Sequence, residues 1–310
     1  MTLRGNLVGG EVPLYFVMAP SYHSSTLLAL LLNNHPDLSS LGDTLPHRRL
    51  YPNQRCGCEA RVRDCSFWQE VHRRLDADRF AHSDFMIPAY PEVSKDYRIN
   101  RVVAQSLTAL SLSLGPGIWK LAPRASSEFL ETFLRFGEVI CELQQSRIFV
   151  NNVKSFTSLL ALRSLLGKRA RIRVIHLIRD PRGYFLSERK QNPAVTPRAS
   201  GRRWLAYHRR VEWLKHYTGP EGYFRLRYED LCDDGEAALA QLCRFLEVEP
   251  QPMCLPVVYP EKNHVLGNVT RLDFDGQIRP SLGWIEATTA EEQRQVLAAT
   301  RPLSQACGYS

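Results

Sequence analysis

The order of apolar segments along the chain constrains its fold more than any other feature. Short apolar or β-branched segments of strand length alternate with longer segments of helical pattern. This alternation predicts an α/β fold with a mostly parallel sheet and helices on both faces. Such sheets bind ligands at the carboxyl ends of their strands. The predicted strands are residues 14–19, 147–151, 171–178 and 223–227, and the predicted helices are 24–33, 156–166, 236–246 and one that begins at Pro181.

Residues 70 to 145 depart from this alternation. They read as mainly helical and irregular, with no clear strand. We interpret them as an insertion that lines or covers the site of an acceptor substrate. No linker divides the chain, so residues 1–310 are predicted to form a single domain.

The chain carries a net charge of +8 and has a pI of about 9.1, which predicts an anionic partner. Residues 199–217 hold several arginines with Trp204 and Trp213, but no nucleic-acid-binding pattern accompanies them, so we interpret the charges as a solvated face. No apolar run reaches the roughly 18 to 20 residues of a membrane span, and the first residues lack the pattern of a signal peptide. We therefore expect a cytoplasmic protein that does not bind nucleic acid. The sequence does not indicate an oligomeric state.

Three of the eight cysteines lie close together, in the segment RCGCEARVRDCSFW. Cys56, Cys58 and Cys65 could bind zinc, but a fourth ligand is not obvious, and His47 and His72 are suggested by proximity only. The alternative is a compact loop with reduced thiols, as expected inside a cell. We take the reduced loop as the default, so no metal is expected to be required.

The segment LYFVMAPSYHSSTLLALLL combines an apolar strand, a short polar loop and a helix. Backbone N–H groups at a loop and at a helix start, together with the helix dipole, form an anion site. Ser24, Ser25 and Thr26 add hydroxyl donors, although the same residues also suit simple helix capping. The segment lacks the GxxxxGK[ST] pattern of a Walker A loop.

The segment VIHLIRDPRGYFLSER places Arg179 at the carboxyl end of a predicted strand. Ser187 follows eight residues later, about two helical turns along the next helix. An arginine fork and a hydroxyl suit a phosphate group. The alternative is a surface ion pair between Asp180 and Arg179 or Arg182.

Four segments taken together resemble the sulfotransferases that use 3′-phosphoadenosine 5′-phosphosulfate (PAPS). The first loop with its following HPDL and LGD resembles the family's 5′-phosphosulfate loop, and IRDPRGYFLSER resembles its 3′-phosphate motif. RYEDLCDDGEAALAQLCRFLEVE resembles the family's YEDL strand and helix, and NHVLGNVTRLDFDGQIRPSLGW resembles its C-terminal cofactor loop. The cysteine segment is similar to one in bacterial-type members. The resemblance implies a P-loop nucleotide-kinase-like sulfotransferase fold, with residues 255–286 as a loop that covers the nucleotide.

The resemblance also implies binding roles for particular residues. The loop from Tyr22 to Leu27 would hold the 5′-phosphosulfate, and Arg179 with Ser187 would hold the 3′-phosphate. Gly267, Asn268 and Arg271 would close over the nucleotide. The cosubstrate would be PAPS, the product 3′,5′-ADP, and the acceptor a small molecule sulfated on a hydroxyl or, as second choice, an amine. The loop residues with this implied binding role are Tyr22, Ser24, Ser25, Thr26 and Leu27.

Catalysis by such an enzyme requires charge neutralisation and a base for the acceptor. Asp43 matches the family's acidic base, where Glu is usual, and Lys154 in NNVKSF matches a lysine that neutralises the transferring group. A turn-capping role for Asp43 and an exposed helix-start role for Lys154 are the alternatives. His23, His35 and His47 are rival bases, of which His35 before a proline is expected to be structural.

Two positions depart from the family pattern. Tyr22 stands where a cation is usual, and Ser24 stands where the loop glycine is usual. Losing one transition-state donor typically costs ~10²–10³ in rate. His23 would compensate if it were protonated. Two rival functions follow: a catalytically impaired nucleotide-binding homologue, and a nucleotide-dependent kinase, which the missing loop lysine disfavours.

Overall fold

The computed structural model describes most of the chain. The described residues are 10–42, 54–75, a few positions between 106 and 118, 123–152, 154–252, 262–272 and 274–310.

Five parallel strands form the central sheet, in the order β2-β3-β1-β4-β5. Four of them lie within two residues of the predicted strands, and β2 was not predicted. The predicted α/β class with a mostly parallel sheet is confirmed. The strands are β1 (Val12–Met18), β2 (Leu38–Ser39), β3 (Ile148–Asn151), β4 (Ala170–Ile178) and β5 (Tyr223–Arg227).

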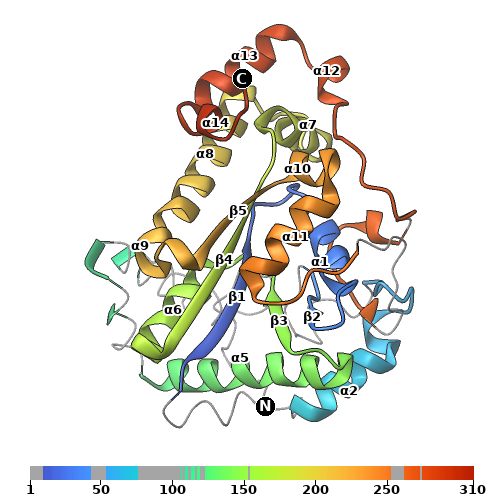
Figure 1. The fold of residues 1–310 in the computed structure, drawn as a ribbon. Helices are drawn as coiled ribbons and strands as arrows, with labels where there is room; N and C mark the ends of the chain where they lie inside the picture. Colours follow the sequence, from blue (N-terminus) through green and yellow to red (C-terminus); the bar gives the residue numbers. More distant parts are fainter. Residues whose placement is uncertain are drawn as a thin grey trace.

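Both faces of the sheet are covered by helices, as a parallel sheet requires. Along β1, Leu14 and Phe16 face one apolar cluster, while Tyr15 and Val17 face the other. Figure 1 shows α6, α8 and α9 on one side of the sheet and α1, α10 and α11 on the other. These helices are α1 (Ser25–Asn33), α6 (Phe156–Leu166), α8 (Pro197–Trp213), α9 (Lys215–Thr218), α10 (Tyr228–Asp233) and α11 (Gly235–Leu246).

Crossover helices join the parallel strands, so their carboxyl ends meet at one edge of the sheet. The loop after β1, the segment after β3 and the start of α7 (Pro181–Gln191) all leave from this edge. Pro181 occupies the first turn of α7, where its missing N–H costs nothing, and the Asp180 side chain accepts from the Arg182 N–H at 2.8 Å.

A C-terminal helical layer packs on α7 and α8 and was not predicted. It contains α12 (Trp284–Ala287), α13 (Ala290–Thr300) and α14 (Leu303–Ala306), drawn in red at the top of Figure 1. Gly201 permits the close approach of α8 to α13, because a Cβ there would lie 2.8 Å from the Ala299 Cβ. The charged face of α8 is solvated as predicted, with Arg202 and Arg209 exposed and Trp204 fully buried.

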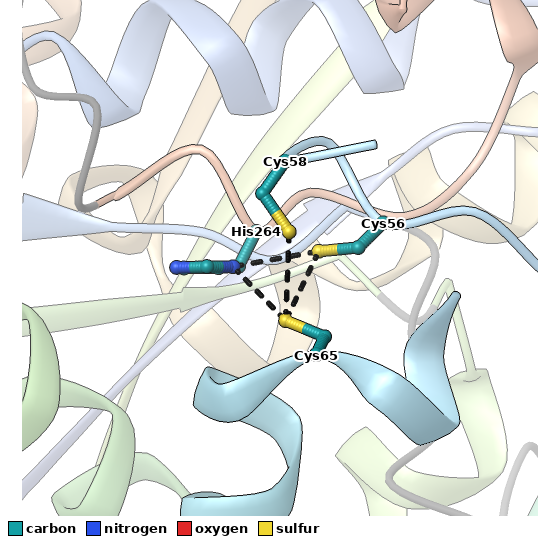
Figure 2. Close-up of side chains that lie close together, drawn as sticks. All are labelled: Cys56, Cys58, Cys65 and His264. Atoms are coloured by element: carbon teal, nitrogen blue, oxygen red, sulfur yellow. Dashed lines mark hydrogen bonds between the residues drawn. The ribbon is translucent and has the colours of Figure 1, made fainter. Parts of the chain in front are cut away.

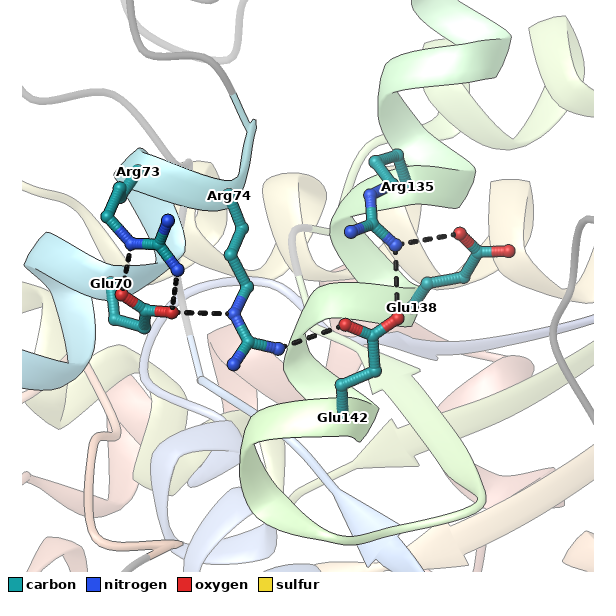
Figure 3. A network of polar contacts seen from close by, with 6 residues as sticks. All are labelled: Glu70, Arg73, Arg74, Arg135, Glu138 and Glu142. Carbon is teal, nitrogen blue, oxygen red and sulfur yellow. Dashed lines mark hydrogen bonds and ion pairs between the residues drawn. The ribbon is translucent and has the colours of Figure 1, made fainter.

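A second, smaller core lies beside the sheet, where α2 (Ser66–Leu75) packs on α5 (Pro123–Gln144). Trp68 and Val71 of α2 belong to the same apolar cluster as Ile140 of α5. An ion pair crosses the surface of this contact, from Arg74 of α2 to Glu142 of α5 at 3.0 Å (Figure 3). The described parts of residues 70–145 are mainly helical, as predicted.

Among the described helices, none combines the length and the apolar character that crossing a membrane demands.

Candidate functional site

The loop between β1 and α1 has the backbone of an anion site. Tyr22 and Ser24 both adopt left-handed conformations, with φ of 66° and 60°. Left-handed geometry costs a residue other than glycine about 1–2 kcal/mol, so Ser24 bears the strain that a glycine there would avoid. The Ser24 side chain makes no capping hydrogen bond to α1, and no acidic residue lies in the first turn of the helix. The first N–H groups of α1 thus keep their capacity to bind an anion.

The start of α1 contacts two other segments predicted to form the site. Asn152, just after β3, donates from Nδ2 to the Ser25 carbonyl at 2.8 Å. The Asn268 N–H donates to the Thr26 Oγ1 at 3.2 Å. Gly267 has φ of 131°, and a Cβ there would lie 2.5 Å from the Thr26 Oγ1, so only glycine fits without a shift. The structure therefore brings the first loop together with Gly267 and Asn268, here called the GN segment. Leu27 packs at the edge of the core.

Arg179 is buried at the end of β4, beside the same loop. Its Nη1 donates to the Tyr22 carbonyl at 2.8 Å, and its Nη2 donates to the Ser281 Oγ. Its Nε has no hydrogen-bond partner among the described residues, and its guanidinium lies 5.1 Å from the centre of the Tyr228 ring. Burial lowers the pKa of Arg179 from its ordinary value. An anion with several acceptors would compensate this buried cation.

Ser187 lies on α7 and donates to the Gly183 carbonyl at 3.0 Å. Its predicted role, to hold a 3′-phosphate together with Arg179, stays a prediction. Asp180 does not pair with Arg179, because it binds Arg182 at 2.7 Å. The ion-pair alternative thus applies to Arg182 and leaves Arg179 for another partner.

Arg271 fixes the GN segment rather than projecting toward open space. It is buried, and it donates to the carbonyls of Val265, Gly267 and Asn268 at 2.8 to 2.9 Å, and to that of Arg55. This geometry supports a positioning role in the loop that the family resemblance assigns to the nucleotide.

His23 is fully buried and both of its ring nitrogens are engaged. Nδ1 lies 3.0 Å from the Ser21 carbonyl, and Nε2 lies 3.0 Å from Nε2 of His208. Burial lowers the pKa of His23 well below its ordinary value, and the charges of Arg179 and Lys154 act in the same direction. A neutral, enclosed ring supplies no positive charge, so the structure gives no support to the compensating role predicted for His23.

The structure describes two of the other candidate catalytic residues, Lys154 and His35. Lys154 follows β3 with φ of 63°, and its charge acts on His23, which places it near the first loop. Asp43 and His47 lie outside the described residues. His35 is buried, with Nε2 2.8 Å from the Glu249 carbonyl and Nδ1 accepting from the Asp37 N–H, which agrees with its expected structural role.

The three clustered cysteines meet a histidine from the far end of the chain. The Sγ atoms of Cys56, Cys58 and Cys65 and the Nδ1 of His264, here called the Cys3His cluster, all lie within 4.8 Å of one another (Figure 2). Contact with the Cys56 thiol lowers the pKa of Cys65 to about 3 and raises that of Cys56, so the pair favours a thiolate at Cys65. His72 is buried on α2 and is not a member of this group.

Sequence reasoning missed His264 because it lies 199 residues after Cys65. Its sequence signal was its place in NHVLGNVTR, three residues before Gly267 in the segment predicted to contact the nucleotide.

The comparison with a solved structure agrees with the fold. The sulfotransferase domain of the olefin synthase from Synechococcus PCC 7002 superposes with a TM-score of 0.54 at 19% identity, covering 97% of this chain and 96% of that one. The sulfotransferase domain from the curacin biosynthetic pathway gives a TM-score of 0.49 at 16% identity, covering 97% and 99%. No curated protein sequence matches the chain. The pattern of the sulfotransferase family matches residues 24–252, well over half of the sequence, and the chain therefore belongs to the sulfotransferase family.

Proposed function

We propose that this sulfotransferase takes its sulfuryl group from PAPS and transfers it to a hydroxyl group of a small molecule. An amine acceptor is the second choice. PAPS carries anionic groups at its 5′ and 3′ positions, and two anion-binding features lie at one edge of the sheet. One is the left-handed loop with the start of α1, and the other is Arg179.

The observation that carries the proposal is the environment of Arg179. Its guanidinium is buried, its Nε lacks a partner among the described residues, and it touches the loop through the Tyr22 carbonyl. A buried cation in this state favours a charged ligand over solvent. A 3′-phosphate would supply the acceptors that Arg179 lacks, with Ser187 turning its hydroxyl away from the Gly183 carbonyl to add a donor.

The remaining groups suit the opposite end of the nucleotide. The N–H groups at the start of α1, with Ser25 and Thr26, would hold the 5′-phosphosulfate. The GN segment rests on Thr26 and would cover the bound nucleotide, while Arg271 keeps this segment in shape.

The reaction requires an oxygen nucleophile and a stable leaving group. The acceptor oxygen forms a bond to sulfur as the bond from sulfur to the 5′-phosphate oxygen breaks, which releases 3′,5′-ADP. The acceptor proton passes to a base, for which Asp43 is the residue proposed, and Lys154 would neutralise the transferring group. Tyr22 provides no cation to the loop, and its ring packs 6.3 Å from that of Tyr184.

Calorimetric titration with 3′,5′-ADP, 5′-AMP and ATP tests the donor site. We expect binding that requires the 3′-phosphate and no Mg²⁺, and a loss of at least about tenfold in affinity for Arg179→Ala, since a charged hydrogen bond contributes roughly 1.5–3 kcal/mol. Arg209→Ala, which removes an exposed arginine from α8, is the matched control. Equal binding of 5′-AMP and 3′,5′-ADP would refute the assignment.

Conversion of PAPS to 3′,5′-ADP in the presence of mixed hydroxyl acceptors then separates the rival functions. Turnover that disappears in Asp43→Asn, with nucleotide affinity retained, supports the transferase. Nucleotide binding without turnover would favour an impaired homologue, and preference for ATP with Mg²⁺ would favour a kinase.

A further inference from the structure

Four of the six distances within the Cys3His cluster match those of a four-coordinate metal site, and the other two lie within 4.8 Å. A tetrahedral zinc ion with Zn–S of about 2.3 Å and Zn–N of about 2.0–2.1 Å separates two sulfurs by about 3.8 Å and a sulfur from a nitrogen by about 3.6 Å. The Cys65 Sγ lies 3.5 Å from the Cys58 Sγ and 3.9 Å from the Cys56 Sγ. The His264 Nδ1 lies 3.4 Å from the Cys56 Sγ and 3.5 Å from the Cys65 Sγ.

The position of Cys65 at the start of a helix suits a negatively charged sulfur. Cys65 stands immediately before the first residue of α2, where the helix dipole favours negative charge. A thiolate is the form in which cysteine binds a metal.

The histidine is held in the orientation that a metal ligand needs. The Phe67 ring stacks on the His264 ring at 4.1 Å with an interplanar angle of 2°. This contact fixes the ring plane, so Nδ1 faces the sulfurs (Figure 2). The Phe67 ring, rather than the sulfurs, therefore sets the orientation of the His264 ring.

Disulfide formation does not explain the group. The sulfur separations of 3.5 and 3.9 Å far exceed the bond length of about 2.05 Å, and all three cysteines are free. Three thiols also leave at least one unpaired. Soft sulfur and imidazole ligands in a tetrahedral arrangement select zinc.

We propose that the Cys3His cluster binds one zinc ion in a structural role. Four protein ligands fill the tetrahedron, so no position remains for a substrate or an activated water. Zinc binds the Cys65 thiolate directly and replaces the protons of the Cys56 and Cys58 thiols, and those protons pass to solvent. The proposal does not depend on the identity of the sulfuryl donor or acceptor.

The ion joins two segments that are remote in sequence. The Gly57 N–H donates to the Val265 carbonyl at 3.1 Å, and the Asn263 Nδ2 donates to the Gly57 carbonyl at 2.9 Å. Gly57 suits this contact, because a Cβ there would lie 2.8 Å from the backbone carbonyl oxygen of Asn263. Zinc would therefore fasten residues 262–271, which include the GN segment, to the cysteine loop at 54–65.

Metal analysis of the full-length protein, purified in reductant without a metal-affinity tag, tests the site. We expect about one zinc per chain in the wild type and less than about a tenth of that in Cys58→Ser and in His264→Ala. Cys141→Ser, which changes a half-buried cysteine of α5 outside the cluster, should keep its zinc. A wild type that holds no zinc even after dialysis against ZnCl₂, an equal loss in Cys141→Ser, or iron in place of zinc would overturn the proposal.

Cobalt(II) substitution of the wild type gives a second test that does not require a folded variant. Apo-protein loaded with CoCl₂ should show the intense visible absorption of a tetrahedral site and sulfur-to-cobalt charge transfer. The weak spectrum of six-coordinate cobalt, or the absence of charge transfer, would contradict Cys3His ligation.

Discussion

The Cys3His cluster and a chain of three buried histidines both place imidazole rings inside the protein, but the hydrogen-bond partners of these rings differ. The histidine chain consists of His23, His208 and His176, all fully buried and joined end to end. Nε2 of His23 lies 3.0 Å from Nε2 of His208, and Nδ1 of His208 lies 2.7 Å from Nε2 of His176. The chain continues from Nδ1 of His176 to the Tyr223 hydroxyl.

The tautomers of the histidine chain follow from its end at Ser21. A carbonyl only accepts, so the proton of His23 resides on Nδ1 and its Nε2 accepts from His208. The same logic makes His208 Nδ1 accept from His176. His23 and His208 each donate one proton and accept another, so these two neutral rings need no ion, while His176 ends on the Tyr223 hydroxyl, which also donates to Glu212 at 2.7 Å.

The Cys3His cluster offers the opposite balance. Its three sulfurs and one ring nitrogen converge on one point. Once the thiols lose their protons, all four of these atoms are acceptors and none of them can donate a hydrogen bond to another. The comparison teaches that counting donors against acceptors, rather than counting histidines, distinguishes a self-sufficient buried network from a site that requires a cation.

Chelation should produce the largest contrast between the two regions. Structural zinc contributes apparent binding energies of about 10–16 kcal/mol in zinc-finger peptides, and losing roughly a third of that here corresponds to a fall of about 10 °C in melting temperature. Differential scanning fluorimetry with and without dipicolinate measures the fall. Cys58→Ser should show a low melting temperature that the chelator does not change further. An unchanged wild type would remove the contrast.

Breaking the histidine chain should have the next largest effect. His208→Ala opens a cavity and leaves a donor on His176 and an acceptor on His23 without partners, so we expect a loss of about 2–4 kcal/mol. Urea denaturation measures the loss, with His216→Ala on the exposed surface as the control. Zinc content should stay at the wild-type level. A loss of zinc in His208→Ala would show that the two regions are coupled.

The pH dependence of stability should report the protonation of the histidine chain. Burial lowers the pKa values of His23, His176 and His208. The unfolded chain, with histidine pKa values near 6.5, therefore binds more protons than the folded one as the pH falls below about 6.5, and stability decreases in that direction. Removing His208 should make this slope shallower by about 1.4 kcal/mol per pH unit. Comparing the wild type with His208→Ala cancels the acid release of zinc, and parallel slopes would argue against neutral buried rings.

Local patterns in the sequence were enough to predict most of the sheet. The strand at 223–227 and the helix at 156–166 have the predicted bounds, because apolar periodicity and neighbouring caps are local signals. Positions that join distant segments were not predicted. His264 lies 199 residues from Cys65, and His208 lies 185 residues from His23, and no local signal links residues so far apart.

The same limit to local signals explains why only part of the candidate site was predicted. Arg179 and the first loop were found because each lies at the end of a strong apolar strand, and the structure brings them into contact through the Tyr22 carbonyl. The burial of His23 was not foreseen. A histidine in a polar loop reads as exposed until the partners that enclose it, from β4 and α8, are known.

The smallest effect is expected from the ion-pair network at the contact between α2 and α5, in which the pair Arg74–Glu142 crosses from one helix to the other. Glu70 accepts from both Arg73 and Arg74, and Arg74 reaches Glu142 at 3.0 Å, while Arg135 binds Glu138 and Glu142 (Figure 3). Glu138 is buried, but Glu70, Arg74 and Glu142 are 30 to 39% exposed, so water and salt screen their ion pairs. Arg74→Ala should therefore shift the melting temperature by less than about 2 °C and leave the zinc content unchanged. Because α2 begins directly after Cys65, this variant asks whether surface charge or the Cys3His cluster holds the helix in place. A fall as large as that of Cys58→Ser would assign this role to the ion pairs.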